Sequence, residues 1–210
     1  MSPSAIIGAM TEPPPAPVDR ASDNETSRLE AFSDGVLAVI ITITAFGLRV
    51  PVGGNFGALG DRLPALLIYV LSFVFIGIYW NNHHHLLRAT TRVSGAVMWA
   101  NLHLLFWLSL IPVVTEWVGA SHTSTAPAAA YSTVALAAAM AFQLLVVAIV
   151  RTEGRDSKVA KALASDLKSR LSTVAYAASI GLAFVTPWIS YALLAAVAVT
   201  WFIPDRRLER

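Results

Sequence analysis

Polar side chains that could do chemistry stand at the start of one hydrophobic run and at two later points. Ser33 and Asp34 open the first run, the histidines 83–85 close the second, and Asn101 lies early in the third. An acid, imidazoles and a hydroxyl can relay protons, hold a metal ion or anchor helices to one another. A charge at mid-membrane costs about 2.5–3.5 kcal/mol on insertion scales, so Asp34 is a functional candidate.

Three adjacent histidines form a poor metal site, because neighbouring positions on a helix point about 100° apart. A metal site needs histidines at i and i+4 together with further ligands, so no metal is expected. One of these histidines, with Asn101 or a nearby asparagine, is instead expected to be a partner of Ser33 and Asp34. Asp34 is either a functional acid or a buried structural anchor, and the sequence is compatible with both roles.

The composition is that of a membrane protein without an enzyme's motifs. The chain has 210 residues, 56% hydrophobic and 13% charged, with a mean hydropathy of +0.62 and no cysteine. Soluble domains carry about 25% charged residues. The sequence contains no glycine-rich phosphate loop, no His-Glu-x-x-His and no nucleophile elbow. We therefore expect no enzyme, no cofactor and no nucleic-acid partner.

The hydrophobic runs that carry these residues predict an all-α membrane protein with six transmembrane helices. Residues 171–204 hold no charge, and one helix of 34 residues would be about 51 Å long, too long for a bilayer. Thr186-Pro187-Trp188 divides that run, although a single long tilted helix would give five spans. The predicted helices are about 28–50, 63–87, 93–118, 127–150, 169–186 and 188–204, with 28–204 as the membrane domain. Residues 1–27 are predicted to be a disordered cytoplasmic tail, and 205–210 a second cytoplasmic tail.

Positive charges predict the orientation. Of the 15 Lys and Arg residues, 13 fall on the side of the termini, and Arg49 and Arg62 fall on the other. Cytoplasmic loops carry the excess of Lys and Arg, so both termini are expected in the cytoplasm. This requires an even number of spans in a multi-pass protein of the plasma or inner membrane.

One face of the first helix is apolar apart from a hydroxyl. At 100° per residue, Thr42, Ile43 and Phe46 lie within about 60° of Val39 around the helix axis. Ser33 and Asp34 lie well away from this stripe. Such a stripe either packs against other helices or lines a pore, where apolar rings act as constrictions and gates. The Thr42 hydroxyl has a structural alternative, a bond back to the carbonyl of Ala38.

Three motifs resemble one known family. Arg28-Leu-Glu-Ala-Phe32-Ser33-Asp34 resembles the Arg-x-x-x-Phe-Ser-Asp signature of the transmembrane protein 175 family, the lysosomal potassium channels and their shorter prokaryotic relatives. The Tyr79–His84 segment is similar to that family's aromatic-Trp-x-x-His-His motif, and Asn101–Thr115 is similar to its third helix. The specific motifs cover residues 28 to about 118.

The resemblance implies a homotetramer with the first helix of each subunit lining a central pore. It implies passive flux of monovalent cations favouring potassium, with no carbonyl filter; no Thr-Val-Gly-Tyr-Gly is present. The family's constricting layers fall on Val39, Thr42 and Phe46, and Phe46 is bulkier than the residue expected there. The implied partners are the bilayer, three further copies of the chain and the cations.

The same resemblance assigns a structural network to seven residues: Arg28, Phe32, Ser33, Asp34, His83, His84 and Asn101. Arg28 also lies at about −20° on the helical wheel, near the apolar stripe, so it is a candidate for the cytoplasmic mouth. Two other functions stay open. One is a proton-coupled transporter using Asp34 and the histidines of the second helix. The other is a non-conducting membrane scaffold.

Overall fold

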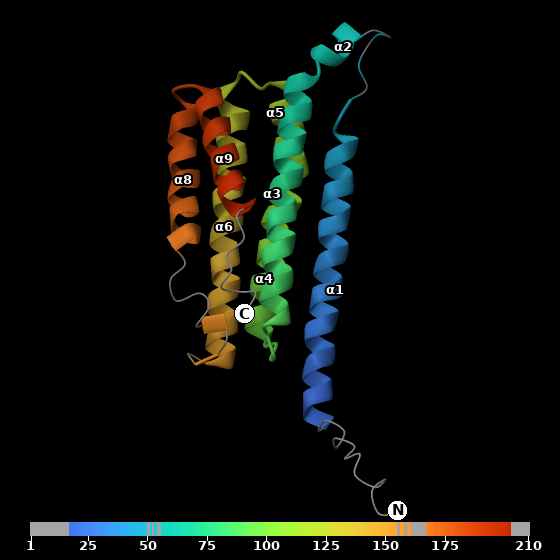
Figure 1. Ribbon diagram of the computed structural model, residues 1–210, viewed down its shortest axis with the longest axis vertical. Helices are drawn as coiled ribbons and strands as arrows, with labels where there is room; N and C mark the ends of the chain where they lie inside the picture. The colour runs from blue at the N-terminus through green and yellow to red at the C-terminus, as the bar shows by residue number, and fades with distance from the viewer. Residues whose placement is uncertain are drawn as a thin grey trace, which may run out of the picture.

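The computed structural model describes residues 17–202 except 50, 52, 54, 55, 155, 158 and 161–166. All the regular elements in this part of the chain are helices (Figure 1). They are α1 (Pro17–Phe46), α2 (Phe56–Gly60), α3 (Leu63–Arg88), α4 (Gly95–Ser109), α5 (Ile111–Ala120), α6 (Thr125–Glu153), α8 (Leu167–Ala183) and α9 (Pro187–Phe202).

The first helix begins and ends earlier than the sequence predicts. It starts at Pro17 rather than near Arg28, so residues 17–27 are helical where a disordered tail was predicted. Proline is favourable at the first helical position, and lengthening an existing helix needs no new nucleus. The helix ends at Phe46 because Gly47, a poor helix former, follows. Residues 1–16 and 205–210, the other parts of the predicted tails, lie outside the described residues.

Proline divides the predicted third helix into α4 and α5. Ser94 begins α4, since its hydroxyl accepts a hydrogen bond from the Val97 amide. The break falls at Leu110, and Pro112 occupies the first turn of α5. Proline has no N–H to donate and its ring clashes with the preceding turn, which explains the break.

The helices form a bundle with α1 along one edge (Figure 1). One face of α1 packs on α3, α4 and α5, while α6 packs on α4, α5, α8 and α9. Ala128, Ala135, Ala138 and Ala141 on α6 are fully buried. Small residues let membrane helices approach closely, so the alanine-rich α6 serves as the central packing element.

Four stretches are long and apolar enough to cross a membrane: Glu25–Phe46, Leu63–Arg88, Gly95–Ala120 and Thr125–Glu153. The helices α8 and α9 are shorter, with 17 and 16 residues. A turn at 184–186 precedes Pro187 and separates them. At about 1.5 Å per residue each is about 25 Å long, slightly less than a typical hydrocarbon core of about 30 Å.

Candidate pore-lining face

One face of α1 is exposed from Arg28 to Phe46. Residues at alternating spacings of three and four, the spacing of one helix face, share this exposure. They are Arg28, Phe32, Gly35, Val39, Thr42 and Phe46. Val39 is 56% exposed and Phe46 is 82% exposed, with Ile43 beside them at 51%. We call these seven residues the exposed line.

The opposite face of α1 is buried. Ser33, Leu37, Ile40 and Thr44 are at most 4% exposed, and this face lies against α3, α4 and α5. Packing within one subunit therefore does not use the exposed line. That line is left free for lipid or for another chain.

Thr42 provides the hydroxyl on the exposed line. Its Oγ1 donates to the carbonyl oxygen of Ala38 at 2.8 Å. A hydroxyl oxygen has two acceptor sites as well as its proton. Because the proton is held by the backbone, the oxygen can still present a lone pair to a cation.

Three buried side chains join α1, α3 and α4 near the end of the bundle that holds the start of α1. Ser33 Oγ donates to the Leu29 carbonyl at 2.8 Å and accepts from Asn101 Nδ2 at 2.9 Å. Asn101 Oδ1 lies 2.7 Å from His83 Nε2. Since an amide oxygen can only accept, His83 carries a proton on Nε2. The Nδ1 atom of His83 is buried without a hydrogen bond. We call Ser33, Asn101 and His83 the buried triad.

A second pair of contacts lies beside the triad. The Trp80 indole donates to Asp34 Oδ1 at 3.0 Å. Glu30 Oε1 lies 2.6 Å from His84 Nδ1, without hydrogen-bond geometry, and the two form an ion pair when the imidazole is protonated. The Trp80 and His84 rings stack with centroids 5.8 Å apart.

Sequence reasoning missed two of these partners. A histidine or an asparagine was expected beside Asp34, and the hydrogen bond that Asp34 accepts from Trp80 was not foreseen. Glu30 was not singled out either. A helical spacing signal was present, because Glu30 lies four residues before Asp34 and Trp80 lies four before His84.

Arg28 and Phe32 are not joined to this network in the structure. Arg28 is exposed, and among the described residues it makes no hydrogen bond or ion pair. Phe32 is 53% exposed. Both side chains belong to the exposed line. Within the described residues no group of three or more His, Asp or Glu side chains is placed to hold a metal ion.

The long apolar helices define the class of a helical membrane protein, and comparisons identify the family. Residues 28–112 match the family model described as endosomal/lysosomal potassium channel TMEM175. The chain is 47% identical to a potassium channel of Chryseobacterium sp. (strain P1-3) over 183 residues, which are 87% of this chain and 95% of that protein. A potassium channel of Streptomyces collinus is 38% identical and covers 78% of this chain and 84% of its own length. The chain belongs to the TMEM175 family.

A solved structure has the same fold. The crystal structure of a lysosomal potassium-selective channel TMEM175 homolog from Chamaesiphon minutus matches with a TM-score of 0.76 and 26% identity, over 86% of this chain and 97% of that one. The endosomal/lysosomal proton channel TMEM175 of Gallus gallus is 33% identical over 42% of this chain, but only 20% of that protein is covered. This protein is therefore a multi-pass, all-α cation channel, and the predicted family and the absence of an enzymatic function are confirmed.

Proposed function

We propose that this protein is a passive channel for monovalent cations that favours potassium. The pore is formed by α1 of four identical subunits, with the exposed line facing the fourfold axis. The observation that carries this proposal is the exposed line itself. Beyond Arg28 at its start it is an apolar face with one hydroxyl, and packing within the subunit leaves it unused.

The constriction consists of side-chain layers. Val39 and Phe46 form apolar rings, with Ile43 at their flank, and Thr42 offers an oxygen between them. Apolar constrictions gate by excluding water, and no carbonyl cage is needed. Potassium gives up its hydration water more readily than sodium, so a narrow apolar throat with one weak oxygen ligand favours it. Phe46, the largest of these residues, sets the tightest layer.

The buried triad and the Asp34–Trp80 contact support the pore from behind. They tie α1 to α3 and α4 on the side away from the exposed line. A helix fixed in this way cannot rotate to move its constricting side chains off the axis. Arg28 lies at one end of the exposed line, so the four copies of Arg28 form a cationic ring at the cytoplasmic mouth of the pore.

The proposed assembly is a homotetramer of six-span subunits in the plasma or inner membrane. The short α8 and α9 are the last two spans, both termini are cytoplasmic, and residues 28–204 form the channel domain. The strong bias of Lys and Arg toward one side of the predicted topology supports this orientation.

Potassium flux into liposomes tests the pore. We expect Phe46→Ala to raise the flux several-fold by widening the tightest layer, and Thr42→Val to lower the preference for potassium over sodium. Phe106→Ala is the matched control, because Phe106 is 55% exposed but lies on α4. Flux and selectivity unchanged by both α1 substitutions would exclude α1 as the pore.

Reversal potentials separate this proposal from the alternatives. A current that reverses at the potassium equilibrium potential supports the channel. The vertebrate relatives are named proton channels, so a proton gradient is the second condition to test. Saturating uptake that requires a proton gradient would favour the transporter that uses Asp34 and the histidines. Absence of any flux would favour a scaffold.

A further inference from the structure

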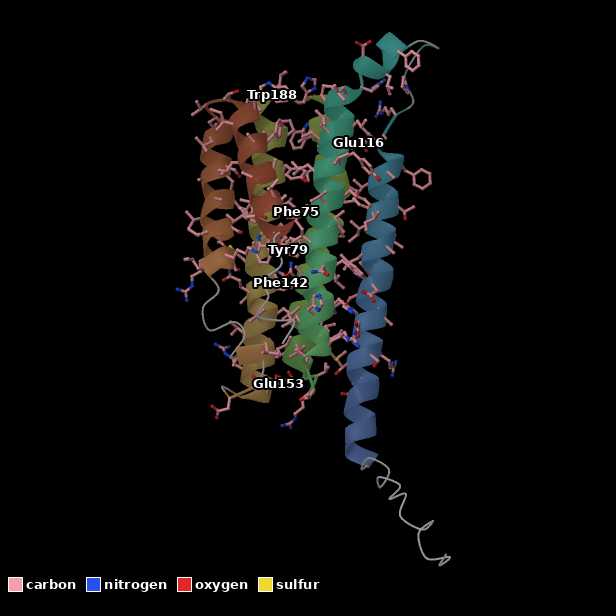
Figure 2. All side chains as sticks on the ribbon, viewed as in Figure 1. Phe75, Tyr79, Glu116, Phe142, Glu153 and Trp188 are labelled. Atoms are coloured by element: carbon pink, nitrogen blue, oxygen red, sulfur yellow. The ribbon has the colours of Figure 1, made fainter. Side chains whose placement is uncertain are left out.

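A pocket of about 480 Å³ lies at the end of the bundle that carries α2, away from the buried triad. Its walls come from the end of α1, from α2, from the start of α3 and from the end of α5. Glu116 on α5, one of its wall residues, lies near that end between α3 and α1 (Figure 2). The volume falls within the range of about 300–1,000 Å³ that is typical of ligand sites.

Two donors in the wall have no partner among the residues that the structure describes. The Arg62 guanidinium is half-buried and makes no hydrogen bond or ion pair with any described residue, and the same holds for the hydroxyl of Tyr69. A half-buried arginine whose guanidinium has no partner among the described residues favours an anionic ligand.

A second guanidinium is only loosely held. Arg49 Nη2 lies 3.2 Å from Glu116 Oε1, but the two side chains are 74% and 50% exposed. Exposed ion pairs contribute little to stability, so Arg49 can turn toward a ligand at small cost. With Arg49, Arg62 and Glu116 in its wall, the pocket carries a net positive charge.

We propose that this pocket binds a phosphate group, carried by an anionic phospholipid headgroup or by a soluble phosphate ester. The planar guanidinium fork matches phosphate oxygens in pairs, and the Tyr69 hydroxyl adds a third donor. The apolar side chains of Leu48, Leu59 and Leu66 in the same wall suit the glycerol and upper acyl carbons of a lipid.

A bound phosphate would join the end of α1 to the start of α3. Small residues already bring the helices together beneath the pocket: a Cβ on Gly119 would lie 3.4 Å from Ala65 Cβ, and one on Gly47 would lie 3.7 Å from Glu116 Cβ. The bound phosphate would bridge Arg49 and Arg62. The inference does not depend on whether α1 lines a pore.

Thermal unfolding of the full chain in detergent micelles tests the site. The probes are short-chain phosphatidylglycerol, glycerol phosphate, and an alkyl glucoside of equal chain length that lacks phosphate. A ligand that binds the folded state raises the unfolding temperature as its concentration increases. We expect a rise with phosphatidylglycerol, none with the glucoside, and an apparent affinity about tenfold weaker or more in Arg62→Gln.

Two further variants make the result specific. Tyr69→Phe removes only the hydroxyl and should weaken binding while leaving the fold intact. Arg92→Gln, an exposed arginine at the other end of the bundle, should change nothing. A rise with phosphatidylglycerol alone identifies a lipid headgroup, and an equal rise with glycerol phosphate identifies a soluble ester. No rise with either probe, or equal rises in wild type, Arg62→Gln and Tyr69→Phe, would overturn the proposal.

Discussion

At the scale of single residues, the buried triad shows how a channel helix can be held by neutral hydrogen bonds. Ser33, Asn101 and His83 are at most 1% exposed, and Asn101 uses both its amide nitrogen and its oxygen. A hydrogen bond between membrane helices is worth about 0.6 kcal/mol on average. Removing one partner costs more, because it leaves another polar group buried and unpaired.

Asn101→Ala tests the triad. We expect it to lower the free energy of unfolding by about 1–3 kcal/mol, because Ser33 and His83 each lose a partner. Unfolding in mixed detergent micelles measures the change. Asn81→Ala is the control, since Asn81 is an exposed asparagine on α3. Equal stability of the two variants would contradict a structural role for the triad.

Substitution of Arg28 tests whether this residue lies at the mouth of the proposed pore. A ring of four guanidiniums repels cations, and salt screens this repulsion over a Debye length of about 10 Å at 0.1 M. We therefore expect Arg28→Gln to increase single-channel potassium conductance at low salt and to leave it nearly unchanged at 1 M. Arg151→Gln, an exposed arginine on α6, should have no such effect. An Arg28→Gln effect independent of salt would place Arg28 outside the ion path.

At the scale of helices, a cluster of buried hydroxyls joins α3, α5 and α6. Ser72 Oγ lies 2.7 Å from Thr115 Oγ1 and 2.9 Å from the Tyr131 hydroxyl. Ser72 Oγ and Thr115 Oγ1 also lie within hydrogen-bond distance of carbonyl oxygens of their own helices. Each hydroxyl has one proton, so one of the two donates to its own helix while the other donates across the pair. The cluster connects the helices that support α1 to α6, the central packing element.

Ser72→Ala tests this connection. We expect a loss of about 1–2 kcal/mol in the free energy of unfolding, since Thr115 and Tyr131 both lose a contact in the apolar interior. Ser109→Ala should be nearly neutral, because Ser109 is exposed and, among the described residues, its hydroxyl bonds only to a carbonyl of its own helix. A double-mutant cycle with Tyr131→Phe measures the coupling directly. A coupling energy near zero would show that apolar packing alone holds these helices together.

At the scale of the whole molecule, the proposal requires four exposed lines to meet at one axis. The natural chain has no cysteine, so any introduced cysteine is the only one. We expect Val39→Cys to form disulfide-linked dimers under mild oxidation in membranes. Val174→Cys on α8 should stay monomeric, although Val174 is more exposed within a subunit, at 66% against 56% for Val39. Monomers alone from Val39→Cys would argue that the line faces lipid.

Much of the fold follows from local chemistry that the sequence shows directly. The apolar runs predict helices of membrane length, and Pro187 predicts a break, since proline cannot continue a helix. The break before Pro112 was not predicted, because the run from 93 to 118 is apolar on both sides of that proline. The start of α1 was missed, because residues 17–27 are polar and lie next to a proline-rich run. Their helix is an extension of the apolar segment that follows, an effect that local composition does not reveal.

By itself, the sequence determined the membrane class, the family signature and the spacing that places Val39, Thr42 and Phe46 on one face of α1. Only the tertiary structure decided which face of α1 is buried and which partner each polar group takes. A helical wheel gives the angle of a side chain on its own helix but not the position of the neighbouring helix. For that reason the hydrogen bond between Trp80 and Asp34 was not predicted. Arg28, which was assigned to the structural network, makes no hydrogen bond or ion pair with the residues that the structure describes.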